Sequence, residues 1–141
     1  EKLLQLYLHD LSQYFKMDFD SAKCEYLYDD LDKYFNEENN YPFFIKVNND
    51  IVGFCLIDIT ETENIIQEIF ILNNYKGQKY GEAAVYKVLD MFKGNWLIKA
   101  VPCSPLAEKF WDKVVKEYTN NKFVKENIGK YLRAVYKFSN K

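Results

Sequence analysis

The chain has 141 residues, of which 48% are hydrophobic and 18% aromatic, and its formal net charge is −2. This length fits one domain with a sizeable core, residues 1–141, and the composition excludes a disordered chain. No apolar run approaches the ~20 residues of a membrane span, and the slightly negative charge argues against nonspecific nucleic-acid binding.

The first helix is predicted over residues 3–15, where an apolar face recurs at helical spacing: Leu4, Tyr7, Leu8, Leu11 and Phe15. A second, shorter helix is predicted over residues 27–35 from Leu27, Leu31, Tyr34 and Phe35, and the run "NEENNYP" ends it. The three cysteines, Cys24, Cys55 and Cys103, form no Cys-x-x-Cys pair, and His9 is the single histidine. We therefore expect reduced thiols, a cytoplasmic location and no metal site.

Three strands follow, over residues 43–47, 51–59 and 65–72, with a tight turn at residues 48–50. Gly53 lies inside the second of them, where glycine is typical of a bulge or of close backbone approach. The next helix runs from Gly81 to Phe92, and Gly94 is expected to end it.

A strand over residues 96–101 precedes a further helix, for which Ser104 is the predicted N-cap and Pro105 the first helical residue. Strands over residues 122–126 and 131–138 complete the chain. The order ααβββαβαββ predicts an α/β layer architecture.

The junction between the strand 65–72 and its following helix, "YKGQKYGEAA", holds two of the five glycines of the chain, Gly77 and Gly81. A helix N-terminus leaves N–H groups without partners, and a turn with glycine lets a phosphate approach them. Lys76 and Lys79 add positive charge, so the window is interpreted as a pyrophosphate cradle. The spacing fits neither a P-loop nor Gly-x-Gly-x-x-Gly. An ordinary strand-to-helix turn that needs one glycine remains the alternative.

This junction resembles that of the GNAT superfamily of N-acetyltransferases, whose motif Arg/Gln-x-x-Gly-x-Gly/Ala holds the pyrophosphate of acetyl-CoA. In one alignment Lys76 replaces the Arg, Lys79 replaces the first glycine and Gly81 matches the second. A shifted alignment, Gln78-x-x-Gly81-x-Ala83, also fits. Either way the resemblance implies that one run of main-chain amides faces the phosphates: Gly77, Gln78, Lys79, Tyr80, Gly81 and Glu82.

A second GNAT motif, Asn-x-x-Ala-x-x-(apolar)-Tyr, matches "SPLAEKFW", residues 104–111. Ala107 and Phe110 fit, whereas Ser104 replaces the Asn and Trp111 replaces the Tyr. The resemblance therefore implies a mixed, mostly antiparallel sheet flanked by helices, with this helix beside the CoA arm. Ser104 is interpreted as a helix cap rather than a ligand.

In GNAT proteins the strand before the glycine turn splays from the next strand. Its free main-chain groups pair with pantetheine, and one N–H stabilises the oxyanion. Here the resemblance assigns those roles to the main chain of Phe70, Ile71 and Leu72, worth about 3 kcal/mol for one preorganised donor. An ordinary, fully paired strand is the alternative.

Glu68 is the candidate general base, because strand alternation places it on one face with Phe70 and Leu72. A carboxylate among apolar residues should have a raised pKa, which suits proton acceptance from an amine. A structural glutamate that pairs with a lysine or a tyrosine remains equally open.

Trp111 stands where many GNAT enzymes have the tyrosine that protonates the thiolate, and indole has no useful acidity. Tyr118 is the fallback on the same helix. The leading hypothesis is direct acetyl transfer from acetyl-CoA to an amine, of a small molecule or a peptide, within a ternary complex. A CoA-binding module without turnover is the alternative, and an α/β interaction domain is a third.

The N-terminal acidic residues predict a cationic acceptor, whose pocket the first two helices and residues 18–29 would shape; a solvated acidic face is the alternative. These residues are Asp10, Asp18, Asp20, Glu25, Asp29, Asp30 and Asp32. The aromatic-rich C-terminal strands could pair across a homodimer, and a monomer is the open alternative.

Overall fold

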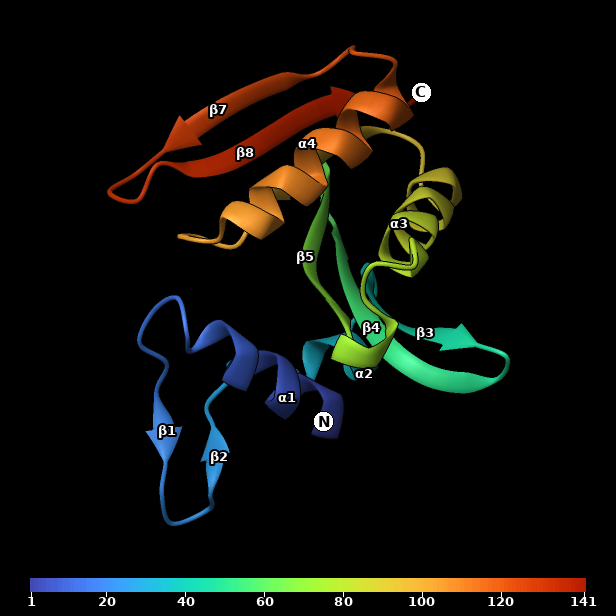
Figure 1. Ribbon diagram of the computed structural model, residues 1–141. Coiled ribbons are helices and arrows are strands. Elements are labelled where there is room, and N and C mark those ends of the chain that lie inside the picture. The colour runs from blue at the N-terminus through green and yellow to red at the C-terminus, as the bar shows by residue number, and fades with distance from the viewer.

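The computed structural model describes all 141 residues. Its elements are α1 (Lys2–Leu11), β1 (Phe19–Asp20), β2 (Glu25–Tyr26), α2 (Lys33–Asn36), β3 (Asn40–Val47), β4 (Asp50–Ile59), β5 (Asn64–Ile71), the 3-10 turn η1 (Asn73–Tyr75), α3 (Tyr80–Met91), β6 (Asn95–Lys99), α4 (Pro105–Thr119), β7 (Val124–Ile128) and β8 (Arg133–Ser139). Six strands form one sheet in the order β3-β4-β5-β6-β8-β7 (Figure 1). Only the β5–β6 pair is parallel, so the predicted mixed, mostly antiparallel α/β architecture is confirmed.

Strand β4 is buried on both faces of the sheet, as its nearly continuous apolar run suggests. On one face Phe54 and Leu56 pack against the α1 stripe, in a cluster that includes Phe70. On the other face Cys55 and Ile57 pack against side chains of α3 and α4. Figure 1 shows α1 on one side of β5 and α4 on the other, which leaves the end of β5 between them.

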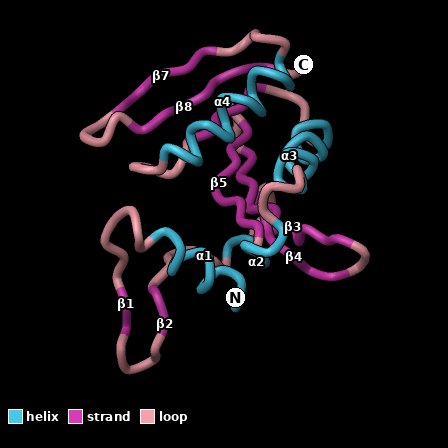
Figure 2. Tube along the Cα trace, in the orientation of Figure 1, coloured by secondary structure: helices cyan, strands magenta, loops and turns pink.

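The predicted second helix over residues 27–35 is wrong. Asp30 adopts a positive φ of 63°, which interrupts any helix there, and only the one-turn α2 forms. Tyr34 is buried but Phe35 is 69% exposed, so the apolar residues do not share one helix face. The residues before the predicted helix form the small β1–β2 hairpin, which projects beyond α1 (Figure 2).

Other element boundaries move by a few residues. The first helix ends at Leu11, four residues earlier than predicted. β3 begins at Asn40 and contains Pro42, which is tolerated because β3 is an edge strand of the sheet. α3 ends at Met91, three residues before Gly94, rather than at the glycine.

Gly53 allows the close backbone approach that its place in a strand predicts. A Cβ there would lie 2.0 Å from the carbonyl oxygen of Phe70 in β5. The bulge is present too, because the β3–β4 pairing shifts by one residue beside Gly53. The β4 and β5 backbones are therefore tightly opposed at the end of β5 that borders the cavity described below.

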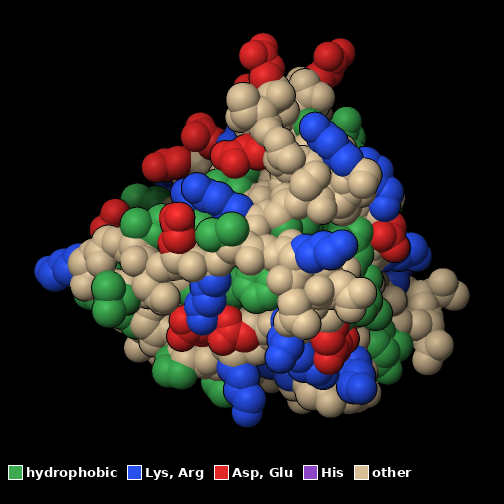
Figure 3. Space-filling view, turned by 90° about the horizontal axis from the view of Figure 1, so that it is seen from above, with side chains coloured by type: hydrophobic (Ala, Val, Ile, Leu, Met, Phe, Trp, Pro, Cys, Tyr) green, Lys and Arg blue, Asp and Glu red, His purple; other side chains and the backbone are tan.

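Charges of both signs are intermixed on the face shown in Figure 3, with no extended area of one sign. No helix combines the length and the apolar character needed to cross a membrane. β7 pairs only with β8 and forms the other edge of the sheet. Pairing of this edge in a homodimer stays a prediction.

Candidate active site

A cavity of about 620 Å³ opens where β5 and β6 diverge. Their parallel pairing covers only Asn64 to Ile66 in β5, although β5 continues to Ile71. α1, α3 and α4 supply the other walls of the cavity. The splay implied by the GNAT resemblance is therefore present.

The main chain of Ile69 and Ile71 faces this cavity. In an antiparallel pair the N–H and C=O of one residue point to the same neighbouring strand, and successive residues alternate. The Phe70 carbonyl points at Gly53 of β4, and the Leu72 N–H donates to the Val52 carbonyl at 2.8 Å. The groups of Ile69 and Ile71 must then point the opposite way, where β6 no longer pairs.

Leu72 does not offer the free main chain that was expected of it. Its N–H bonds to Val52, and its carbonyl accepts from the N–H of Tyr75 at 2.9 Å. Both groups are used to close the β5–η1 corner. Of the three residues assigned to this role, Ile71 alone has main-chain groups facing the cavity, and Ile69 was missed.

The turn before α3 and the first turn of α3 together present six consecutive main-chain N–H groups, from residues 77 to 82, that donate to no protein acceptor. Lys79 is the N-cap residue, and no side chain caps the helix. The next amide, that of Ala83, already bonds to the carbonyl of Lys79 at 3.0 Å. This end of the cavity is therefore rich in unpaired donors, as an anion site requires.

Lys79 holds the left-handed conformation, with φ at 65°. Glycine adopts this conformation without strain, which explains why a glycine would suit the position. Gly77 also has a positive φ, 79°, whereas Gly81 does not. Gly81 instead faces the ring of Phe110, since a Cβ there would lie 3.5 Å from two ring atoms.

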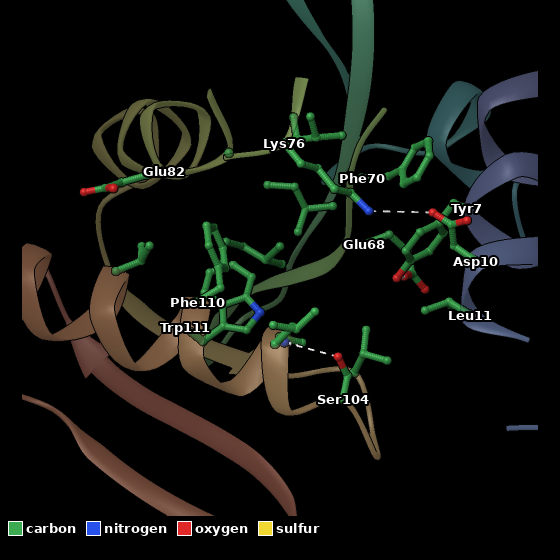
Figure 4. A pocket seen from close by; sticks show the side chains of 18 of the residues that line it. Tyr7, Asp10, Leu11, Glu68, Phe70, Lys76, Glu82, Ser104, Phe110 and Trp111 are labelled. Atoms are coloured by element: carbon green, nitrogen blue, oxygen red, sulfur yellow. Dashed lines mark hydrogen bonds and ion pairs between the residues drawn. The ribbon is translucent and has the colours of Figure 1, made fainter. Parts of the chain in front are cut away.

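The charged side chains of this turn do not all point at the amides. Lys76 Nζ lies 3.7 Å from Asp10 of α1 and 5.9 Å from the Phe70 ring, so it spans the cavity (Figure 4). Glu82 points away from the cavity centre and pairs with Lys113 at 3.4 Å. The Gln78 side chain bonds back to the carbonyl of Asn74 at 3.2 Å.

Helix α4 forms the wall opposite β5 with Ala107, Phe110 and Trp111. Ser104 is its N-cap and accepts from the N–H of Ala107 at 3.1 Å, so the predicted cap is confirmed. Trp111 is 4% exposed and packs edge-to-face against Phe110. Tyr118 bonds to Asp90 at 2.8 Å and lines no part of the cavity, which removes it as the fallback acid.

Glu68 lines the cavity and accepts hydrogen bonds from two tyrosines. Tyr7 of α1 donates to Oε2, and Tyr28 donates to Oε1 at 3.4 Å. Burial raises the pKa of Glu68, although both hydrogen bonds oppose this rise. Burial and the nearby Glu68 charge also raise the pKa of Tyr7 well above its ordinary value, so Tyr7 keeps its proton.

Sequence reasoning anticipated a tyrosine as one possible partner of Glu68, and the structure shows two, but it did not identify Tyr7 or Tyr28. Tyr7 was assigned to the apolar stripe of the first helix, which its burial confirms, but its hydroxyl reaches the cavity. Tyr28 lay in a predicted helix that does not form. A tyrosine on an apolar stripe is the one available signal, because a buried hydroxyl needs a partner.

The acidic residues near the N-terminus do not gather around the cavity. Asp10 alone of the seven lines it, together with Tyr7, Leu11, Gln13 and Tyr14 of α1 and the loop that follows. The segment 18–29 and α2 contribute no lining residue, contrary to expectation. Asp20, for example, accepts from the Ala22 N–H at 3.0 Å within the hairpin turn.

Comparison with known proteins settles the family. The sequence profile of the Acetyltransferase (GNAT) family matches residues 8–114, which is most of the chain. The chain belongs to the GNAT family. As a GNAT member it is an acetyltransferase that uses acetyl-CoA. No curated protein sequence matches it significantly.

Solved structures agree with the GNAT fold. An acetyltransferase from Thermus thermophilus superposes with a TM-score of 0.67 at 15% identity, covering 98% of this chain and 89% of that one. Escherichia coli ElaA gives 0.60 at 15% identity, with 96% and 85% covered. A GNAT acetyltransferase from Elizabethkingia anophelis, solved with acetyl-CoA bound, gives 0.53 at 14% identity, with 77% and 80% covered.

Proposed function

We propose that residues 1–141 act as a single domain that transfers the acetyl group of acetyl-CoA directly to a primary amine. One observation carries the proposal: a single cavity has five residues with unpaired main-chain amides at one end, residues 77 and 79–82, and the buried carboxyl of Glu68 at the other, whereas the predicted Gln78 does not line it. The unpaired amides can bind a phosphate group, and the carboxyl of Glu68 can accept a proton from an amine. Holding both substrates together would supply much of the rate enhancement.

In this proposal the pyrophosphate binds the amides of residues 77–82, with Lys79 adding positive charge. The pantetheine arm then runs between β5 and α4. It pairs with the main chain of Ile69 and Ile71 on one side and packs on Ala107, Phe110 and Trp111 on the other. That a GNAT acetyltransferase of similar fold from Elizabethkingia anophelis was solved with acetyl-CoA bound supports the choice of acetyl-CoA as the donor.

The chemical step needs an oxyanion donor and a base. A cavity-facing N–H of β5, from Ile69 or Ile71, is preorganised to stabilise the oxyanion when the amine attacks the thioester carbon. Glu68 then accepts the proton from the amine nitrogen. Its raised pKa makes it a stronger base than an exposed carboxylate, and Tyr7 holds it in place.

We still propose a cationic acceptor, although fewer carboxylates support this class than the acidic N-terminal sequence suggested. Only Asp10 and Glu68 contribute carboxylates to the α1 side of the cavity. An amine with a second positive charge could take the place of Lys76 beside Asp10 while its reacting nitrogen approaches Glu68. A panel of mono-amines and diamines of equal length tests this, and a preference for neutral or acidic acceptors contradicts it.

The first experiment is a thermal-shift assay with acetyl-CoA, CoA and ATP. A ligand at 100 times its dissociation constant adds about 2.7 kcal/mol of stability. A shift with both CoA species but not ATP supports the site. Release of free thiol that depends on an added amine then separates the enzyme from a CoA-binding module without turnover.

Glu68→Gln tests the base. Loss of a general base costs roughly 10²-fold or more in kcat, and acetyl-CoA affinity should persist. Glu63→Gln is the matched control, because Glu63 directly precedes β5 and lines no part of the cavity. Equal activity of the two variants would assign Glu68 a structural role only.

A further inference from the structure

Arg133 is the only arginine of the chain, and its positive charge has no partner in the protein. It is the first residue of β8 and is half-buried. Its Nε donates to the Ala100 carbonyl at 2.7 Å, but its two Nη groups donate to no protein acceptor, and no ion pair includes it. No side-chain nitrogen sealed inside the protein lacks a partner, so both Nη groups reach open space.

Arg133 lines a second, smaller cavity of about 180 Å³, between the turn from β6 to α4 and the turn from β7 to β8. This side cavity shares Val101 and Ser104 with the main cavity, so the two adjoin. Glu108 also lines the side cavity, but its carboxylate pairs with Lys125 at 3.0 Å. Arg133 therefore supplies the uncompensated charge of the side cavity.

The side cavity adjoins the main cavity far from the amide-rich end. Phe110 of α4 faces Gly81 at that end. Ser104 precedes Phe110 by six residues, which corresponds to about 9 Å along the helix axis. Figure 4 shows Ser104 at the end of the cavity where Glu68 lies. The acceptor amine, rather than the phosphates, is thus the neighbour of the side cavity in the proposed function.

The direction of the Arg133 side chain agrees with this placement. Ala134 and Tyr136 belong to the cluster that packs against α4, so by strand alternation Arg133 is on the opposite face of the sheet. Glu68 is on that face too, beside Tyr7 of α1. Burial raises the pKa of Glu68, and the positive charge of Arg133 opposes this rise together with the two tyrosine hydrogen bonds, as a nearby cation must.

A guanidinium group is always charged and presents a planar fork of donors that matches a carboxylate. Because Nε is held by Ala100, the two Nη groups remain as an oriented pair of donors. A single carboxylate would balance the single charge, whereas a phosphate would bring a second negative charge close to Glu68.

We propose that Arg133 binds a carboxylate of the acceptor, which makes the acceptor a diamino acid rather than a plain polyamine. This inference rests on the proposed function, in which one amine of the acceptor approaches Glu68 and a second cation meets Asp10.

The test uses two pairs of probes in which only one member has a carboxylate: lysine with 1,5-diaminopentane, and ornithine with 1,4-diaminobutane. Calorimetry measures the binding of each probe to protein saturated with CoA, which requires no turnover. We expect the wild type to bind the amino acid of each pair at least tenfold more tightly, and Arg133→Gln to bind both members equally. Lys99→Gln is the matched control, because Lys99 is a cation that lines the main cavity but not the side cavity, and this variant should keep the preference.

Three results would overturn the inference. The wild type could bind both members of each pair equally. Arg133→Gln could weaken both members by the same factor, as expected if Arg133 only holds Ala100 in place. Lys99→Gln could lose the preference while Arg133→Gln keeps it. Should Arg133→Gln not fold, Arg133→Lys replaces it. Lysine keeps the charge but cannot hold Ala100 and bind a carboxylate through a fork, so an unchanged preference in that variant would contradict the inference.

Failure of the proposed function gives a different pattern. If the amino acids bind with the expected preference but no amine is acetylated, the transfer fails and the carboxylate site stands. If the plain diamines are acetylated as fast as the amino acids, the transfer stands and the carboxylate site fails. A wild type that binds no CoA loses the proposed function, and the same titrations of the free protein then decide the carboxylate site.

Discussion

Replacing Gly81 with valine tests the phosphate end of the cavity. Gly81 is the second residue of α3, and its φ does not require glycine. A Cβ there would point at Phe110, 3.5 Å away, and at Ile71, 3.8 Å away. Because Gly81, Phe110 and Ile71 all line the cavity, a side chain at position 81 would extend into the volume that a ligand would occupy.

The expected loss follows from the donors involved. A net hydrogen bond to a charged group contributes about 1.5–3 kcal/mol, and about 1.4 kcal/mol is a tenfold change in affinity. Moving the pyrophosphate away from one amide of the 77–82 run therefore weakens CoA binding at least tenfold. Gly81→Ala should have a smaller effect, because its single methyl group reaches only ordinary contact with Phe110.

Calorimetric titration of acetyl-CoA and CoA measures the affinity of each variant, and a melting curve measures its stability separately. Valine is a better helix former than glycine, so the fold should persist. Gly94→Ala is the control: its φ is 151° and a Cβ there would lie 3.2 Å from the Asn64 amide nitrogen, which predicts lost stability with unchanged affinity. A folded Gly81→Val that binds acetyl-CoA as wild type does would refute the anion site.

Three further changes test neighbouring parts of the argument. Tyr7→Phe removes a hydrogen bond that favours the Glu68 carboxylate, so the pKa of Glu68 should rise and the acidic limb of kcat/KM should move to higher pH; a limb that stays in place would show that another group is the base. Lys79→Gly should gain about 1 kcal/mol of stability in urea unfolding by relieving the left-handed conformation, whereas Lys79→Ala should not. Gly53→Ala should cost about 3 kcal/mol, because its Cβ would lie 2.0 Å from the Phe70 carbonyl oxygen, while Gly129→Ala, with open space around its Cβ, should cost less.

Local signals predicted the parts of the fold that local chemistry determines. The start of α4 at Ser104-Pro105 could be predicted because the cap involves only the Ser104 side chain and the main-chain amide three residues later. The apolar run of β4 identifies a buried strand whatever its partners are. The glycine turn before α3 was likewise predicted correctly in place, although the positive φ at Lys79 was not, because lysine carries no signal for it.

The carboxyl environment of Glu68 could not be predicted in the same way. Its partners are 61 and 40 residues away in sequence, so their contact depends on how α1 docks on the sheet. The wrong prediction of a second helix has the same cause, a dependence on tertiary contacts. Tyr34 packs beneath β4 through tertiary contacts, and a helical spacing of four apolar residues cannot reveal that.

The divergence of β5 and β6 has causes on both strands. At the end of β6, Ala100 is drawn toward β8: its N–H donates to the Ala134 carbonyl at 2.9 Å, and its carbonyl accepts from Arg133 Nε at 2.7 Å. On β5, the pairing with β4 skips Gln67, which forms a bulge directly after the last β5–β6 pair. A bulge increases local twist, so β5 turns away from β6 at the point where the end of β6 is bonded to β8.

The same bulge determines the direction of Glu68. Side chains alternate along a strand, so the extra residue shifts every later side chain of β5 to the opposite face. With Gln67 skipped, Glu68 pairs with Leu56 and Phe70 with Phe54, on the face that α1 covers. The Gln67 amide is itself held by Asp58 at 2.9 Å. One bulge thus accompanies the opening of the cavity, frees the main chain of Ile69 and Ile71, and turns the carboxyl of Glu68 toward Tyr7.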